Sequence, residues 1–112
     1  KQAINEQTAY KMIYMLRGGT EEERGSALGL PREVRVDNEV GGKTGTTNDA
    51  SDGWFIGVTH NLVGGAWVGG DERAVRFPSW PFGQGSRSAL PIFGKFLAKV
   101  YADPKIGVTK GQ

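Results

Sequence analysis

The residues best suited to chemistry are Lys43-Thr44-Gly45-Thr46-Thr47, which place a cation, three hydroxyls and a glycine side by side. In an extended segment, Lys43, Gly45 and Thr47 point to one face, and Thr44 and Thr46 point to the other. Gly45 has no side chain, so a ligand can approach the backbone closely. Such a strand can bind a carboxylate and present a backbone N–H to a carbonyl oxygen.

A phosphate-binding loop is the first alternative, because Gly42-Lys43-Thr44 matches the end of that motif. The motif also needs a glycine at position 37, which is Asp37, and a helix after the lysine. Residues 53–59 are instead rich in residues that favour strands. These two departures argue against phosphate binding. The second alternative is a polar edge strand that has no catalytic or binding role. The segments that flank the motif distinguish this alternative from a ligand-binding strand.

Composition predicts one ordinary globular domain. The chain has 112 residues, of which 38% are hydrophobic and 23% charged, and its net charge is +2. The basic residues are scattered, so we do not expect nucleic acid as a partner. There is no cysteine, and the single histidine, His60, falls in a predicted turn. We therefore expect no metal site and no cofactor.

The first half of the chain predicts two helices. Asn5 is a good N-cap for a helix over residues 6–17, which Gly18-Gly19 should end. One face of this helix is apolar and consists of Ala9, Met12, Ile13 and Leu16. Thr20-x-x-Glu23 has the form of a capping box and predicts a short helix over 21–28. Val34 and Val36 alternate with charged residues, which allows a short exposed strand.

The second half predicts three strands and a helix. The strands span 42–47, 53–60 and 62–70, and the short connection at 59–62 makes the last two antiparallel. After a loop at 71–87, Ser88 should cap a helix over 89–101, with an apolar stripe of Leu90, Phe93, Leu97 and Val100. Helices at both ends of an antiparallel sheet indicate an α+β fold. Trp54, Phe55, Trp67 and Phe93 are expected in its core.

The carboxylates after the central motif are less suited to catalysis. Asp49 and Asp52 could form a catalytic pair, but aspartates between two strands are typical of turns. The run Glu21-Glu22-Glu23 suits a solvated helix start. We therefore assign none of these carboxylates to a site.

The flanks of the central motif resemble the class A penicillin-binding proteins. The motif Gly42-Lys43-Thr44-Gly45-Thr46-Thr47 is followed by Gly53-Trp54-Phe55-Ile56-Gly57 and by Gly64-Gly65-Ala66-Trp67-Val68-Gly69-Gly70. Ala89-Leu90-Pro91-Ile92-Phe93 resembles the terminal helix of that family's transpeptidase domain. Ala9-Tyr10 also fits the family's helix before the Lys-Thr-Gly strand, whereas residues 31–41 match least. The resemblance implies the last three strands of a five-stranded penicillin-binding sheet.

The resemblance also implies roles for matched residues in serine acyl transfer, the reaction that cross-links peptidoglycan stem peptides. Lys43 and Thr46 would be catalytic. Lys43, Thr44, Gly45, Thr46 and Thr47 would bind the stem peptide or a β-lactam. The hydroxyl of Thr46 would bind the substrate carboxylate, and its backbone N–H would be one arm of the oxyanion hole.

The family's other two motifs, Ser-x-x-Lys and Ser-x-Asn, do not occur around any serine of this chain: Ser26, Ser51, Ser79, Ser86 and Ser88. We therefore expect the chain to be an inactive C-terminal piece of a longer transpeptidase, whose nucleophile lies upstream. The resemblance implies a bifunctional parent, with a glycosyltransferase, that is anchored in the inner membrane and faces the periplasm. The strand at 62–70 would pair with the rest of that polypeptide, or with a second copy in its absence.

Two other functions remain open on the sequence alone. The chain could be a non-catalytic folding or interaction module that binds a partner through its sheet edge. It could also derive from a serine β-lactamase or D,D-carboxypeptidase of the same superfamily, although the tryptophan-rich hairpin and the helix at 89–101 argue against this.

Overall fold

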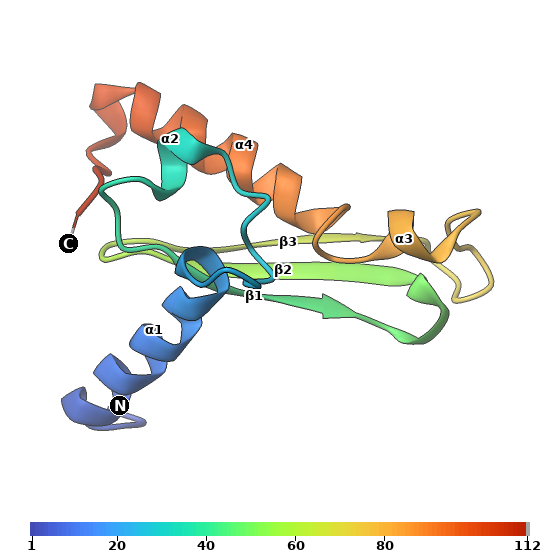
Figure 1. Ribbon diagram of the computed structural model, residues 1–112, viewed down its shortest axis with the longest axis horizontal. Coiled ribbons are helices and arrows are strands. Elements are labelled where there is room, and N and C mark those ends of the chain that lie inside the picture. Colours follow the sequence, from blue (N-terminus) through green and yellow to red (C-terminus); the bar gives the residue numbers. More distant parts are fainter. Residues whose placement is uncertain (112) are drawn as a thin grey trace.

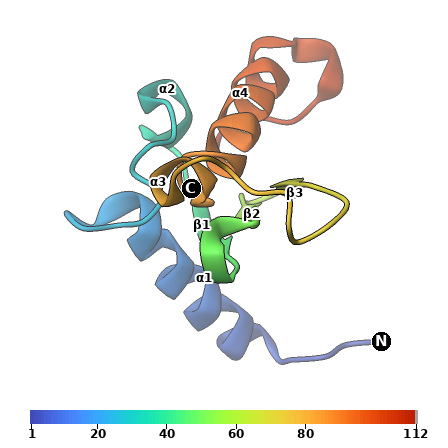
Figure 2. The same ribbon diagram turned by 90° about the vertical axis from the view of Figure 1, so that its right-hand side faces the viewer.

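The computed structural model describes residues 1–111 and shows a three-stranded antiparallel sheet between helices (Figure 1). Helix α4 covers one face of the sheet, and the end of α1 contacts the other face (Figure 2). The predicted α+β fold is therefore confirmed. The elements are α1 (Glu6–Glu21), α2 (Arg32–Arg35), β1 (Gly41–Thr46), η1 (Asn48–Ala50), β2 (Asp52–Val58), β3 (Val63–Gly69), α3 (Trp80–Gly83), α4 (Ala89–Ala102) and η2 (Pro104–Ile106).

The strands lie in the order β1-β2-β3, and each predicted strand is found within two residues of its expected ends. Lys43 pairs with Ile56 across β1 and β2, and Trp54 pairs with Trp67 across β2 and β3. Thr59 N donates to the carbonyl of Leu62 at 2.8 Å and closes the second hairpin. The short loop predicted at this position thus produces the expected antiparallel pair.

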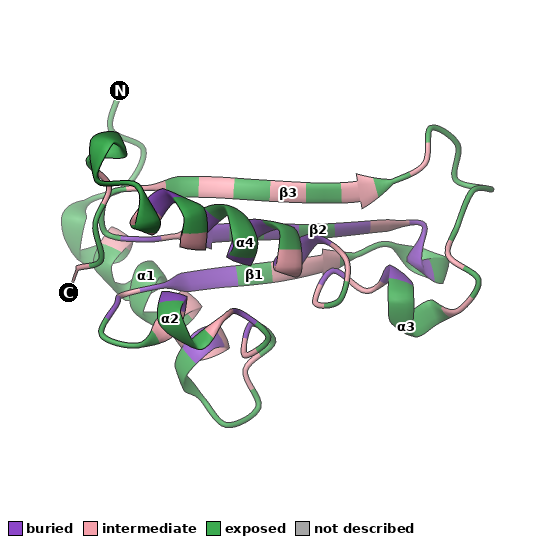
Figure 3. Cartoon of the chain, turned by 90° about the horizontal axis from the view of Figure 1, so that it is seen from above, coloured by how far each residue is buried: buried purple, intermediate pink, exposed green. Residues whose placement is uncertain are grey.

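The core lies between the sheet and α4. Phe55 of β2 is fully buried and contacts Phe93 of α4, with ring centroids 5.1 Å apart. The stripe predicted on the terminal helix is buried along its length. Figure 3 shows buried residues at the start of β1, along β2 and on α4, whereas β3 alternates between exposed and intermediate. Helix α4 thus packs on β2 and β3, whereas β1 contacts α1 and β2.

Two paired glycines let α4 approach the sheet, and they lead to a test of the packing. A Cβ on Gly57 would lie 2.3 Å from the ring of Phe93, whereas a Cβ on Gly64 would lie 3.1 Å from the same ring. We expect Gly57→Ala to lower the free energy of unfolding by about 1–3 kcal/mol through overpacking. Gly64→Ala is the matched control and should cost less. Denaturant unfolding of both variants measures this, and an unchanged Gly57→Ala midpoint would contradict the packing.

The predicted short helix at 21–28 is wrong. Helix α1 continues through Gly18 and Gly19 to Glu21, and the following residues form turns. Each glycine costs a helix only about 1 kcal/mol, and tertiary contacts can offset this. A Cβ on Gly19 would lie 3.1 Å from the carbonyl oxygen of Gly42, so the glycine brings α1 against β1.

Two smaller expectations also need correction. Val34 lies in the short helix α2, where it is fully buried, rather than in an exposed strand. Trp54 and Trp67 are each 47% exposed on the face opposite α4, where they contact each other. The apolar face of α1 is also open, with Met12 47% exposed. Its first turns project away from the sheet (Figure 2), so residues 1–111 leave Met12 and Ile13 uncovered, whereas Leu16 lies against Gly41 of β1.

Candidate functional site

Strand β1 carries four of the five residues singled out from the sequence, and Thr47 follows directly after it. Lys43 is exposed on the face opposite α4, and its Nζ donates to the carbonyl of its neighbour Thr44 at 2.8 Å. Thr44 and Thr46 lie on the other face, since they pair with Phe55 and Gly53. The cation and the two hydroxyls therefore flank the same short stretch of backbone from opposite faces.

The outer edge of β1 is free among residues 1–111, because β1 pairs only with β2. Thr47 N donates to the carbonyl of Asp52 at 3.1 Å, toward β2. Backbone N–H groups alternate in direction along a strand. The N–H groups of Thr44 and Thr46 therefore point to the free edge, where a ligand carbonyl can reach them. This is the direction that an oxyanion donor requires.

The hydroxyl of Thr47 is engaged in the turn that follows β1. Thr47 Oγ1 accepts from the backbone N–H of Asp52 at 2.9 Å and lies 2.9 Å from Ser51 Oγ. The same turn holds Asp49 and Ala50 at positive φ, 60° and 53°, which is uncommon for residues other than glycine. Thr47 thus helps to shape the end of the strand.

The two aspartates of this turn have separate partners. Asp49 forms an ion pair with Arg76 at 3.4 Å, and Asp52 accepts from the indole N–H of Trp67 at 3.2 Å. Ser51 Oγ also lies 3.3 Å from the Asp52 carboxylate. Each carboxylate therefore has a structural partner, as the turn interpretation predicts.

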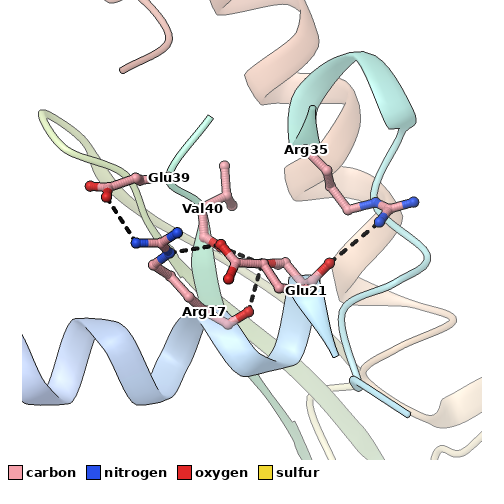
Figure 4. Close-up of polar contacts among 6 residues, drawn as sticks. Arg17, Glu21, Arg35, Glu39 and Val40 are labelled. Atoms are coloured by element: carbon pink, nitrogen blue, oxygen red, sulfur yellow. Dashed lines mark hydrogen bonds and ion pairs between the residues drawn. The ribbon is translucent and has the colours of Figure 1, made fainter. Parts of the chain in front are cut away.

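The start of β1 is tied to the end of α1 (Figure 4). Thr20 donates its hydroxyl proton toward the carbonyl of Val40, and Arg35 Nη1 donates to the carbonyl of Thr20 at 3.3 Å. Arg17 bridges Glu21 at 2.7 Å and Glu39 at 2.8 Å. These side chains remain partly solvated, and surface ion pairs contribute about 1 kcal/mol or less each.

The guanidinium of Arg17 has a raised pKa. Its hydrogen bond to Glu21 raises the pKa of Arg17 above the ordinary value, and the charges of Glu21 and Glu39 act in the same direction. Arg17 is therefore charged when it bridges the two glutamates.

A hollow of about 380 Å³ lies beside Lys43, between the end of α1 and the start of β1. It is open to solvent and is lined on one side by Gly42 and Lys43, and on the other by Met15, Leu16 and the turn after α1. The ammonium group of Lys43 is thus accessible from the side of the sheet that α4 does not cover.

Sequence reasoning missed one contact at the site. Gly85, in the loop before α4, donates its backbone N–H to Thr46 Oγ1 at 3.0 Å. The signal for it was Gly83-x-Gly85, because glycines in a loop permit close approach between backbones. Glycines are frequent in this chain, at 18 residues, so this pair did not stand out.

Two kinds of feature are absent from the part of the chain that the structure describes. No group of three or more His, Cys, Asp or Glu side chains in residues 1–111 could hold a metal ion. None of the helices in this range has both the length and the apolar character needed to cross a bilayer.

Comparison with known proteins identifies the family. Penicillin-binding protein 1A of Pseudomonas aeruginosa is 41% identical over 104 residues, and that of Rickettsia felis is 34% identical over 105 residues. Penicillin-binding protein 1B of Haemophilus influenzae is 28% identical over 109 residues. These matches cover 89%, 88% and 97% of this chain but only 11%, 12% and 13% of the relatives. No protein-family model matches. The chain spans little more than a tenth of the length of these relatives, and it belongs to the family of class A penicillin-binding proteins.

Proposed function

We propose that this chain supplies the carboxylate-binding and oxyanion strand of a serine D,D-transpeptidase. The observation that carries the proposal is the geometry of β1: an exposed lysine and an exposed threonine hydroxyl lie beside a free strand edge to which the N–H of Thr46 points. The relatives are named penicillin-binding proteins, which supports a parent in the peptidoglycan synthase family.

In the proposed reaction, a serine of the parent attacks the carbonyl carbon of a stem peptide or β-lactam. The carbonyl oxygen becomes an oxyanion, and the N–H of Thr46 donates a hydrogen bond to it. The terminal carboxylate of the ligand binds the hydroxyls of Thr46 and Thr44. Lys43, on the opposite face of β1, supplies positive charge across the free strand edge to that carboxylate and to the serine of the parent's Ser-x-Asn motif. Gly45 leaves room for the ligand backbone.

The location and partners of the chain follow from the same proposal. The parent faces the periplasm, is anchored in the inner membrane outside these residues, and binds peptidoglycan stem peptides and β-lactams. It also carries a glycosyltransferase. The residues described here form the last strands of its transpeptidase sheet, and the rest of the same polypeptide is their main partner.

The proposal predicts different results for the parent protein and for this chain alone. The parent should gain one equivalent of a β-lactam, and the mass increment should equal the whole antibiotic because opening of the ring expels no group. This chain should gain none, since no serine in it is followed by lysine at the third position.

Intact-mass measurement after incubation with a β-lactam distinguishes the two. A parent that stays unmodified would contradict the proposed function. Stoichiometric acylation of this chain would instead contradict the placement of the nucleophile.

A further inference from the structure

The loop before α4 lies directly against the site strand. Gly85 is buried, and its backbone N–H donates to Thr46 Oγ1 at 3.0 Å. A Cβ on Gly85 would lie 2.4 Å from the carbonyl oxygen of Trp54 and 2.6 Å from that of Gly45. No side chain fits at this position unless the loop moves, so Gly85 holds the loop and the strand in backbone contact.

Other contacts fix this loop from both sides. Leu90 N donates to the carbonyl of Gly85 at 2.9 Å, which joins Gly85 to the first turn of α4. Ser88 Oγ donates to the carbonyl of Gln84 at 2.8 Å. A Cβ on Gly53 of β2 would lie 2.2 Å from the same Ser88 Oγ. The loop is therefore closely packed between α4 and the sheet.

The contact determines what the hydroxyl of Thr46 can do. A threonine hydroxyl has one proton to donate and two lone pairs that accept. Because one lone pair of Thr46 Oγ1 points to Gly85 N, the hydroxyl proton of Thr46 takes one of the other two staggered positions. Both of these positions point away from the loop. Since Thr46 is exposed, these directions lead to solvent or to a ligand. A hydroxyl that accepts a hydrogen bond also becomes a better donor.

We propose that Gly85 is a positioning residue for the Thr46 hydroxyl: its backbone N–H orients and polarises that hydroxyl for donation to the carboxylate of the ligand. The inference rests on the proposed function. It adds to the proposed function that the loop before α4 contributes to recognition of the carboxylate. The contributing atom is the backbone nitrogen of Gly85, which does not touch the ligand.

The test uses the full-length parent, with acylation by benzylpenicillin and by its methyl ester, which lacks the anionic carboxylate. Gly85→Ala should displace the loop rather than β1, because β1 is held by β2 along its whole length. We expect acylation by the free acid to fall roughly tenfold and acylation by the ester to change by less than about twofold. In a Thr46→Val background, Gly85→Ala should cause no further loss.

Two other variants keep the test decisive. Ser88→Ala removes the bond to Gln84 without adding volume, and we expect a loss of about threefold that is again confined to the free acid. If Gly85→Ala does not fold, the Ser88→Ala variant tests the role of Gly85 in its place. Gly29→Ala is the control, because its Cβ would meet Leu90 Cδ2 at an ordinary 3.4 Å, and it should acylate as the wild type does.

Equal losses with acid and ester, or no loss with either, would overturn the assignment of Gly85 and leave the proposed function intact. A further loss in the Thr46→Val background would overturn it as well. A wild-type parent that benzylpenicillin does not acylate would remove the proposed function and this inference together.

Discussion

Replacing Lys43 by alanine in the intact parent should lower β-lactam acylation by about 10²–10³-fold, the usual effect of removing a group that stabilises the transition state. Thr46→Val should lower it by about 10–100-fold, because a hydrogen bond to a charged carboxylate is lost while the backbone N–H remains. Both side chains are exposed, so neither change removes core packing. The second-order acylation rate constant is the measurement.

A matched control separates the site from general surface charge. Lys95 is also exposed, but it lies on α4, away from β1. Lys95→Ala should acylate at the wild-type rate, and all three variants should retain the wild-type unfolding midpoint. Wild-type acylation in both Lys43→Ala and Thr46→Val would refute the assignment of the site to β1.

This chain on its own should self-associate. Among residues 1–111, β3 pairs only with β2, so one row of its N–H and C=O groups has no strand partner. The strand carries no charge from Val63 to Gly69, and Val63 is 69% exposed. Uncharged free edges are templates for pairing with another chain. Size-exclusion chromatography with light scattering should therefore show an average mass that rises with concentration.

A charge on this edge should suppress the association. Val63→Lys places an ammonium group at the edge and should shift the chain toward monomer. Val75→Lys adds the same charge at an exposed position in the loop after β3 and should leave the association unchanged. A monomeric wild-type chain at high concentration would show that the edge is covered from within the chain.

The sheet could be predicted from the sequence because its signals are local. The connection at 59–62 is too short for anything except a hairpin, and glycine-rich segments with tryptophan and valine alternate at the period of a strand. The side-chain arrangement of Lys43 and Thr46 follows from the same period. The strand limits, the antiparallel pairing and the two faces of β1 therefore needed no tertiary information.

The parts that were missed depend on contacts between distant segments. The glycines at 18 and 19 are ordinary helix-ending signals, and only the approach of α1 to Gly42 explains why the helix continues to Glu21. Likewise, Thr46 and Gly85 are far apart in sequence, and no local pattern relates a threonine in a strand to a later loop. The exposure of Trp54 could not be foreseen because a strand pattern does not say which faces are covered.

The strand that carries Lys43 is held at both of its ends. At its start, Thr20 and Arg17 join α1 to Val40 and Glu39, and at its finish, Gly85 contacts Gly45 and Thr46. Fixing a residue's backbone costs about 1–2 kcal/mol of conformational entropy. In β1 that loss occurs during folding, before a ligand arrives. A ligand that binds along this edge therefore does not have to order the strand, and more of its interaction free energy remains as affinity.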